Sequence, residues 1–206
     1  ALDANTTGAN NVAIGDEALT ANTSGASNTA VGAGSLESVT TASANTAVGR
    51  TALQNNTGAN NTAVGHASLQ DNTTGTQNVA VGYAAANSNT TSNAITAVGY
   101  NSLTNTTGGE NTAVGYNSLA LNTSGINNVA VGSRSLDANT TANNNTGVGY
   151  ASLGANTTGA SNVALGTASL QVNTTGNNNV AVGANTLDAN TTASNNTAVG
   201  HQALTA

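Results

Sequence analysis

The sequence is poor in charge and in aromatic side chains. Charged residues make up 5% and aromatic residues 2% of the 206 residues, every aromatic residue is Tyr, and Phe, Trp, Met, Cys and Pro are absent. A typical soluble domain carries about a quarter charged residues. Without large apolar side chains the chain cannot fill a compact globular core, and without charge it does not resemble a disordered segment. Order must therefore come from a regular backbone ladder.

These absences also exclude classes of function. The lack of Cys excludes disulfides, zinc-thiolate sites and cysteine nucleophiles. The net charge of −6, with Arg50 and Arg134 as the fixed cations, argues against nucleic-acid binding. No apolar run approaches the roughly 18 residues of a membrane span. An active site needs a cluster of unlike residues, which a repetitive chain does not supply, so we expect no enzymatic activity, cofactor or metal.

The sequence is a tandem repeat. The segment Asn-(Thr/Val)-Ala-(Val/Ile/Leu)-Gly recurs, with single departures, at steps of 17 residues except for two steps of 16, from Gly49 to Gly65 and from Gly99 to Gly115. We count repeat positions from the Asn. We expect both short steps to lack a residue between the position-nine Leu and the next Asn-Thr. The repeats start near 11, 28, 45, 61, 78, 95, 111, 128, 145, 162, 179 and 196. The pattern predicts one array over 1–206, uncapped at both ends.

Each repeat predicts one coil of an all-β, parallel β-solenoid, with about 17 residues per coil and about 12 coils. Positions one to four alternate with period two and are rich in β-branched residues, which indicates a strand. The Gly at position five ends this strand. Position nine is predicted to anchor a second short strand, and the Asn-Thr-Thr-Gly stretch to turn the chain.

The alternation also predicts which side chains face the interior, since positions two and four share one face of the strand. We expect the aliphatic residues at position four and the Leu residues at position nine to form the core. This predicted core comprises Ile14, Val31, Val48, Val64, Val81, Val98, Val114, Val131, Val148, Leu165, Val182 and Val199, with Leu19, Leu36, Leu53 and Leu69.

The opposite face of the strand carries a nearly unvarying Ala at position three. An exposed position would vary more, so we expect this face to pack against sister chains. The predicted oligomer face comprises Ala13, Ala30, Ala47, Ala63, Ala80, Ala97, Ala113 and Ala130. Three buried apolar side chains contribute about 4–8 kcal/mol per coil, less than ordering 17 residues costs. This deficit favours a homotrimer.

Two polar positions recur as ladders. A Thr in each turn could stabilise the turn, or could form a surface-binding ladder for ice or another crystal; the ladder comprises Thr23, Thr40, Thr57, Thr73, Thr90, Thr106 and Thr123. The Asn at position one is predicted to stack its amide between coils. The turn also contains Asn-Thr-Thr or Asn-Thr-Ser, for example at Asn22 and Asn122, which fits N-glycosylation as well as turn chemistry.

The repeats at 111–127 and 145–161 resemble the YadA-like head repeats of trimeric autotransporter adhesins, and equally the shafts of bacterial surface proteins and phage tail-fibre-like proteins. The resemblance implies a left-handed β-roll of three interlocked chains outside the cell. The repeats of this chain differ from the best-known head repeats, which are shorter. We expect a structural extracellular fibre, or an adhesin shaft or head segment, that holds binding regions away from a surface.

Two alternatives stay open. The first is an ice- or crystal-surface-binding solenoid, because the repeat is also similar to grass ice-recrystallisation-inhibiting proteins. The second is a self-assembling filament subunit. The expected partners are further copies of the chain and a host or matrix surface, with no nucleic acid and no membrane insertion by this segment.

Overall fold

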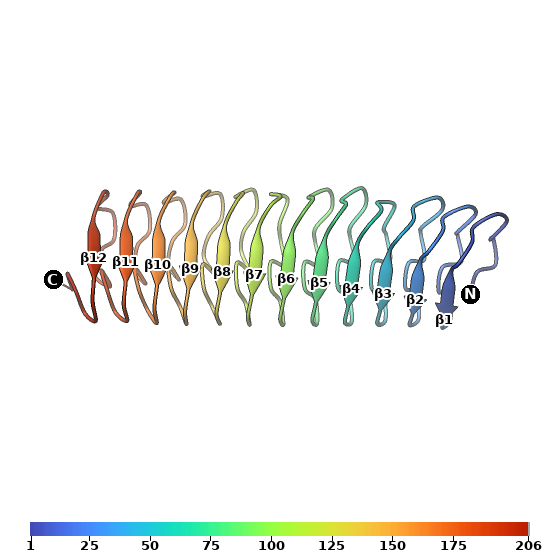
Figure 1. Ribbon diagram of the computed structural model, residues 1–206, viewed down its shortest axis with the longest axis horizontal. Helices are drawn as coiled ribbons and strands as arrows, with labels where there is room; N and C mark the ends of the chain where they lie inside the picture. Colours follow the sequence, from blue (N-terminus) through green and yellow to red (C-terminus); the bar gives the residue numbers. More distant parts are fainter. Residues whose placement is uncertain (206) are drawn as a thin grey trace. The chain divides into compact units, whose positions relative to one another are not determined.

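The computed structural model describes residues 1–205 and divides the chain into two compact units, Ala1–Thr104 and Asn105–Ala206 (Figure 1). Unit 1 contains β1 (Val12–Ile14), β2 (Thr29–Val31), β3 (Thr46–Val48), β4 (Thr62–Val64), β5 (Val79–Val81) and β6 (Thr96–Val98). Unit 2 contains β7 (Thr112–Val114), β8 (Val129–Val131), β9 (Thr146–Val148), β10 (Val163–Leu165), β11 (Val180–Val182) and β12 (Thr197–Val199). Residues 1–205 contain no helix, and so none that could cross a membrane.

Within each unit, every strand pairs in parallel with the next strand of the sequence (Figure 1). Residues at the same repeat position stand opposite each other: Ala47 pairs with Ala63, and Ala130 pairs with Gly147. One repeat is therefore one coil, and neighbouring coils lie about 4.8 Å apart. The prediction of an all-β, parallel solenoid with about 17 residues per coil is confirmed.

The strand ends at the position-five Gly because no other residue fits there. Gly149 has a φ of +132°, which side-chain-bearing residues rarely adopt. A Cβ on Gly149 would lie 2.5 Å from the carbonyl oxygen of Gly166 in the next coil. The glycines thus stack backbone against backbone and let consecutive coils approach closely.

The predicted second strand at position nine is wrong, because the chain forms turns there. Leu153 has a φ of 52°, in the left-handed region. This conformation costs a Leu about 1–2 kcal/mol. Complete burial of its side chain and a hydrogen bond from its N–H to the Ser169 carbonyl (3.0 Å) offset that cost. The Leu part of the predicted core is correct, since Leu19, Leu36, Leu53 and Leu69 have no exposed surface.

The two faces of the strand are reversed relative to the prediction. The Ala at position three points into the coil, and the aliphatic residue at position four points out. The side chains wrongly assigned to the core range from partly exposed to 70% exposed, and they are Ile14, Val31, Val48, Val64, Val81, Val98, Val114, Val131, Val148, Leu165, Val182 and Val199. The residues predicted as an oligomer face are fully buried, except the partly buried Ala13, and they are Ala30, Ala47, Ala63, Ala80, Ala97, Ala113 and Ala130.

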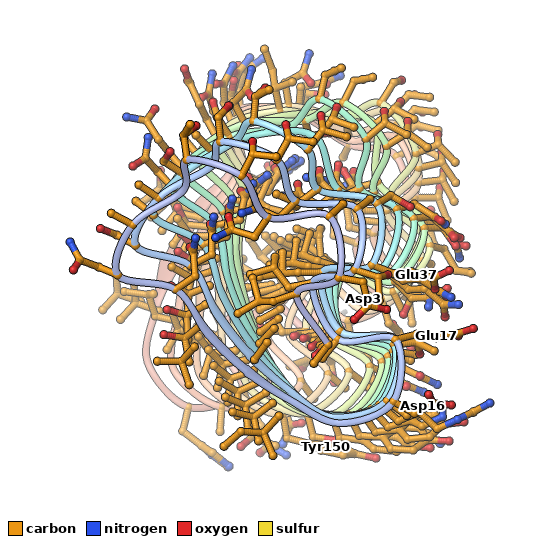
Figure 2. All side chains as sticks on the ribbon, turned by 90° about the vertical axis from the view of Figure 1, so that its right-hand side faces the viewer. Asp3, Asp16, Glu17, Glu37 and Tyr150 are labelled. Carbon is orange, nitrogen blue, oxygen red and sulfur yellow. The ribbon has the colours of Figure 1, made fainter. Side chains whose placement is uncertain are left out.

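The reason for the reversal is the narrow interior of the coil, which is filled by columns of side chains (Figure 2). The position-nine Leu and the position-eight Ser or Ala lie inside together with the Asn at position one. At Gly147, the one Gly at position three, a Cβ would lie 2.6 Å from Ser135 Oγ, so that even a methyl group there requires the Ser135 side chain to rotate. A methyl group fits opposite these side chains and a Val does not. A buried Ala column cannot contact a sister chain.

Candidate functional surfaces

The Asn at position one forms the predicted ladder between coils. The Oδ1 of Asn128 accepts a hydrogen bond from the backbone N–H of Asn145 in the next coil (3.0 Å). The Nδ2 of Asn145 in turn donates to the Gly159 carbonyl (2.8 Å). Both Asn side chains are fully buried. These side-chain amides therefore satisfy backbone N–H and C=O groups next to the N-terminal end of each strand, and they are not available to bind a ligand.

A second Asn ladder runs through position twelve, where sequence reasoning saw only turn chemistry. Asn139 Nδ2 donates to Asn122 Oδ1 (2.8 Å), and Asn156 Nδ2 donates to Asn139 Oδ1 (3.2 Å). The same Nδ2 of Asn139 also reaches the Ala142 carbonyl (3.2 Å). Since Asn22 and Asn122 belong to this buried column, these glycosylation-like triplets serve the turn in the folded chain.

The two short repeats lose their residue later in the turn than predicted. Leu53 and Asn56 keep the three-residue spacing of Leu69 and Asn72, so the segment after the Leu is intact. In full-length repeats the position-twelve Asn Nδ2 bonds the carbonyl three residues on, as Asn72 does. In the first short repeat Asn56 reaches the Gly58 carbonyl, two residues on (2.7 Å). The deletion therefore lies between the Asn-Thr pair and the Gly.

This shift corrects one member of the predicted Thr ladder. Thr106 is fully buried and takes the place of the position-twelve Asn, with its hydroxyl donating to the Gly108 carbonyl (2.9 Å). Thr107 is the residue in the Thr column, and its hydroxyl donates to the Thr123 carbonyl (2.8 Å).

Four other members of the predicted ladder also donate a hydroxyl hydrogen bond to the next coil. Thr23 Oγ1 donates to the Thr40 carbonyl (3.1 Å), and Thr73 Oγ1 donates to the Thr90 carbonyl (2.9 Å). Thr57 and Thr123 do the same with the Thr residues that follow them. Each hydroxyl has a single proton, and here it serves the coil-to-coil ladder. This geometry favours the turn-stabilising role.

The outer face of the sheet is an uncharged surface in each unit. It consists of strand positions two and four, which carry only Thr, Val, Ile and Leu. Val79, Val81, Val129 and Val131 are each between 36% and 39% exposed. Contiguous exposed apolar surface is typical of contact faces. Sequence reasoning missed this face because it assigned the same residues to the core.

Position six carries an exposed column of aromatic residues in unit 1. The rings of His66 and Tyr83 stack with centroids 5.2 Å apart, and those of Tyr83 and Tyr100 stack at 5.1 Å. Arg50 Nη1 lies 3.3 Å from His66 Nε2 at one end of the column. The stacking follows from the coil spacing and covers the ring faces, so mainly the ring edges are presented to solvent.

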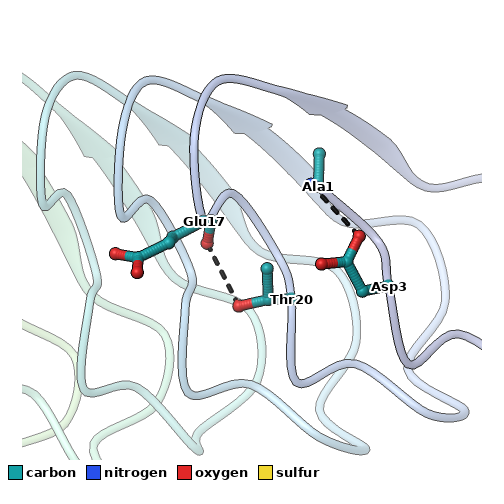
Figure 3. Close-up of polar contacts among 4 residues, drawn as sticks. All are labelled: Ala1, Asp3, Glu17 and Thr20. Atoms are coloured by element: carbon teal, nitrogen blue, oxygen red, sulfur yellow. Dashed lines mark hydrogen bonds and ion pairs between the residues drawn. The ribbon is translucent and has the colours of Figure 1, made fainter.

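The acidic residues of the first coils do not form a metal site. Glu17 and Asp16 project outwards from the coil (Figure 2). Thr20 Oγ1 donates to the Glu17 carbonyl (3.3 Å), while the Glu17 carboxylate points away, and Asp3 lies 3.5 Å from the amino group of Ala1 (Figure 3). Among residues 1–205, no three His, Cys, Asp or Glu side chains are grouped to hold a metal ion.

Comparison with known proteins returned no match of significant similarity, whether to a protein-family model, a curated protein or a solved structure. The resemblance to YadA-like head repeats therefore remains a prediction from the repeat motif.

Proposed function

We propose that the chain is a structural segment of an extracellular fibre or adhesin shaft. The uncharged outer face, formed by positions two and four of every strand, is the observation that carries this proposal. A regular backbone ladder with stacked amides gives stiffness, and repetition provides length. The left-handed roll and the cell-surface location are what the resemblance to adhesin head repeats implies.

In this proposal the copies associate as a homotrimer through the outer face, and not through the buried Ala column. Exposed β-branched side chains at regular spacing can interdigitate with those of a second sheet. The face holds no charge that would have to be desolvated on association. Burying it would also supply the stabilisation that a single narrow coil lacks.

Light scattering on the full chain tests this association. The expected mass is three times that of one chain. Replacing Val114, Val131 and Val148 by Lys should yield the mass of a single chain, because Lys charges on the contact face oppose its burial. A control with Lys at Ser124, Thr141 and Thr158, which are exposed in the turns, should retain the trimer. A stably folded wild-type chain with the mass of a monomer would exclude the proposal.

Binding to ice or another crystal surface is the second candidate function. The flat columns of Thr and Val on the outer face favour it, because they repeat at the coil spacing. Thermal hysteresis in dilute solution would support this function, and ice crystals of unaltered shape would count against it. An end-to-end filament is the remaining arrangement, and electron microscopy of the native material distinguishes it from discrete trimers.

A further inference from the structure

Position ten, directly after the buried Leu, shows where the repeats of the two units diverge. In unit 1 long polar side chains fill this column. Gln54 Nε2 donates to Glu37 Oε2 (2.7 Å), and Gln70 Nε2 donates to Gln54 Oε1 (3.0 Å). Asn87 Nδ2 continues the column towards Gln70 Oε1 (3.3 Å). The surface of unit 1 is thus closed at this position by interlocked amides.

In unit 2 the same column is interrupted by Gly154, which stands between Asp137 and Gln171. The missing side chain leaves an open hollow of about 390 Å³. Arg134, Asp137, Tyr150 and Gln171 line it together with the smaller side chains of neighbouring coils. This volume lies near the lower end of the range of small-molecule sites, about 300–1,000 Å³. The hollow thus brings unlike residues together on one surface of unit 2.

The polar groups of the hollow differ in depth. Asp137 is half-buried, whereas Arg134, Gln171 and Tyr150 are exposed, and Tyr150 projects from the outside of the coil (Figure 2). Within residues 1–205, no ion pair joins Arg134 to Asp137. The exposed Arg134 guanidinium and the exposed Gln171 side-chain amide line the hollow and can donate hydrogen bonds to a ligand.

Burial raises the pKa of the Asp137 carboxyl above its ordinary value, and its own N–H, Arg134 and the Ala138 N–H lower it in part. The fold thus places a carboxylate where it is incompletely solvated. Carboxylates with raised pKa values in a hollow are typical of binding and catalytic sites.

We propose that this hollow binds a neutral saccharide of hexose size. The two oxygens of the Asp137 carboxylate accept hydrogen bonds from adjacent sugar hydroxyls, and Arg134 and Gln171 donate to sugar oxygens. The Tyr150 ring and the exposed Val172 side chain cover the apolar C–H face of the ring. Such a site would give the fibre a defined point of attachment in addition to its structural role.

Titration of the full chain with the methyl glycosides of glucose, galactose and mannose and of N-acetylglucosamine, followed by NMR, tests the site. We expect at least one of them to bind with a Kd of about 1 mM, as suits an open hollow. Asp137→Asn and Tyr150→Ala should each weaken binding about tenfold or more. Gly154→Gln should abolish it, because a side chain like those of Gln54 and Gln70 would refill the column.

Matched controls separate this site from the rest of the solenoid. Asp188→Asn occupies the same repeat position in another coil of unit 2, and Tyr83→Ala the equivalent of Tyr150 in unit 1. Both should bind as the wild type does, and all variants should keep its circular dichroism spectrum. Absence of binding to every glycoside at 50-fold the expected Kd, about 50 mM, would overturn the proposal. Unchanged binding by Gly154→Gln would overturn it as well.

Discussion

Gly147 in β9 and Gly149 directly after β9 provide the sharpest prediction, because the same substitution should have opposite effects at the two positions. Gly149 ends the strand, and Gly147 lies in its centre at the position that carries Ala in the other strands. We predict that Gly149→Ala strongly destabilises unit 2 and that Gly147→Ala stabilises it.

The magnitude for Gly149 follows from two independent costs. A φ of +132° strains any side-chain-bearing residue by about 1–3 kcal/mol. A Cβ would also lie 2.5 Å from the oxygen and 2.6 Å from the carbon of the Gly166 carbonyl, both of them backbone atoms. The coils would have to separate, which breaks ladder hydrogen bonds. We expect a loss of about 4 kcal/mol or more, a value that only a few mechanisms produce.

At Gly147 the obstacle is movable. A Cβ there would meet Ser135 Oγ at 2.6 Å and Ser152 Oγ at 2.9 Å. Ser135 now donates to the Gly147 carbonyl (2.9 Å), but Ser169, at the same repeat position, donates to the glycine three residues before it. Rotation of Ser135 to that arrangement frees the space. A buried methyl and the reduced entropy of the unfolded chain then stabilise the strand by about 1 kcal/mol.

Urea denaturation followed by circular dichroism, with hydrogen exchange of unit 2 amides, measures both changes. Exchange is needed because repeat arrays can unfold in parts, so that a single midpoint does not report one unit. If Gly149→Ala were tolerated within about 1 kcal/mol, the close stacking of coils at position five would be refuted. If Gly147→Ala cost as much as Gly149→Ala, the interior would be more rigidly packed than the Ser rotation assumes.

Three further predictions concern the interior and the hollow. Asn22 Oδ1 is buried without a partner because Val39 interrupts the Asn ladder. Val39→Asn would restore that partner in exchange for buried apolar surface and should change the free energy of unfolding by less than about 1 kcal/mol. Val39→Ala only removes buried surface and should lower it by about 2 kcal/mol, as denaturation midpoints will show. Leu153→Ala should lower the free energy of unfolding by about 2–5 kcal/mol, because Leu153 is fully buried. Leu121 is 54% exposed, so Leu121→Ala should change it by no more than about 0.5 kcal/mol, and equal losses would contradict the assigned interior. Because the pKa of Asp137 is raised in the folded chain, its contribution to stability is present at low pH and is lost as the pH rises through that pKa. Asp137→Asn should therefore stabilise the chain at pH 7 but not at a pH below the ordinary pKa of 3.8, as thermal melts at the two pH values will show.

The repeat length and the parallel stacking were predictable, because a period kept over the whole chain specifies one coil per repeat. The buried Leu column and the Asn column at position one were predictable for the same reason. The inside and outside of the strand were not. The two-residue period of a strand shows which residues share a face, but not which face is inside. Hydrophobicity favours Val for the interior, whereas the space that Leu and Asn leave there admits only the methyl group of Ala.

The hollow and the exact turn residues were also beyond sequence reasoning. Asn56-Thr57 and Thr106-Thr107 can each be aligned with the longer turns in more than one way, and only their hydrogen bonds show which residue is missing. Gly154 is one residue in a variable position of the repeat. Its consequence depends on Asp137 and Gln171, one coil away on each side.

A cross-sectional image of the native assembly, at a resolution that separates individual coils, tests whether the chains associate through their outer faces. We predict three chains around one axis, with the Ala column inside each coil and the Thr and Val columns of the outer face buried between chains. A single coil stack whose outer face is in contact only with solvent would contradict it.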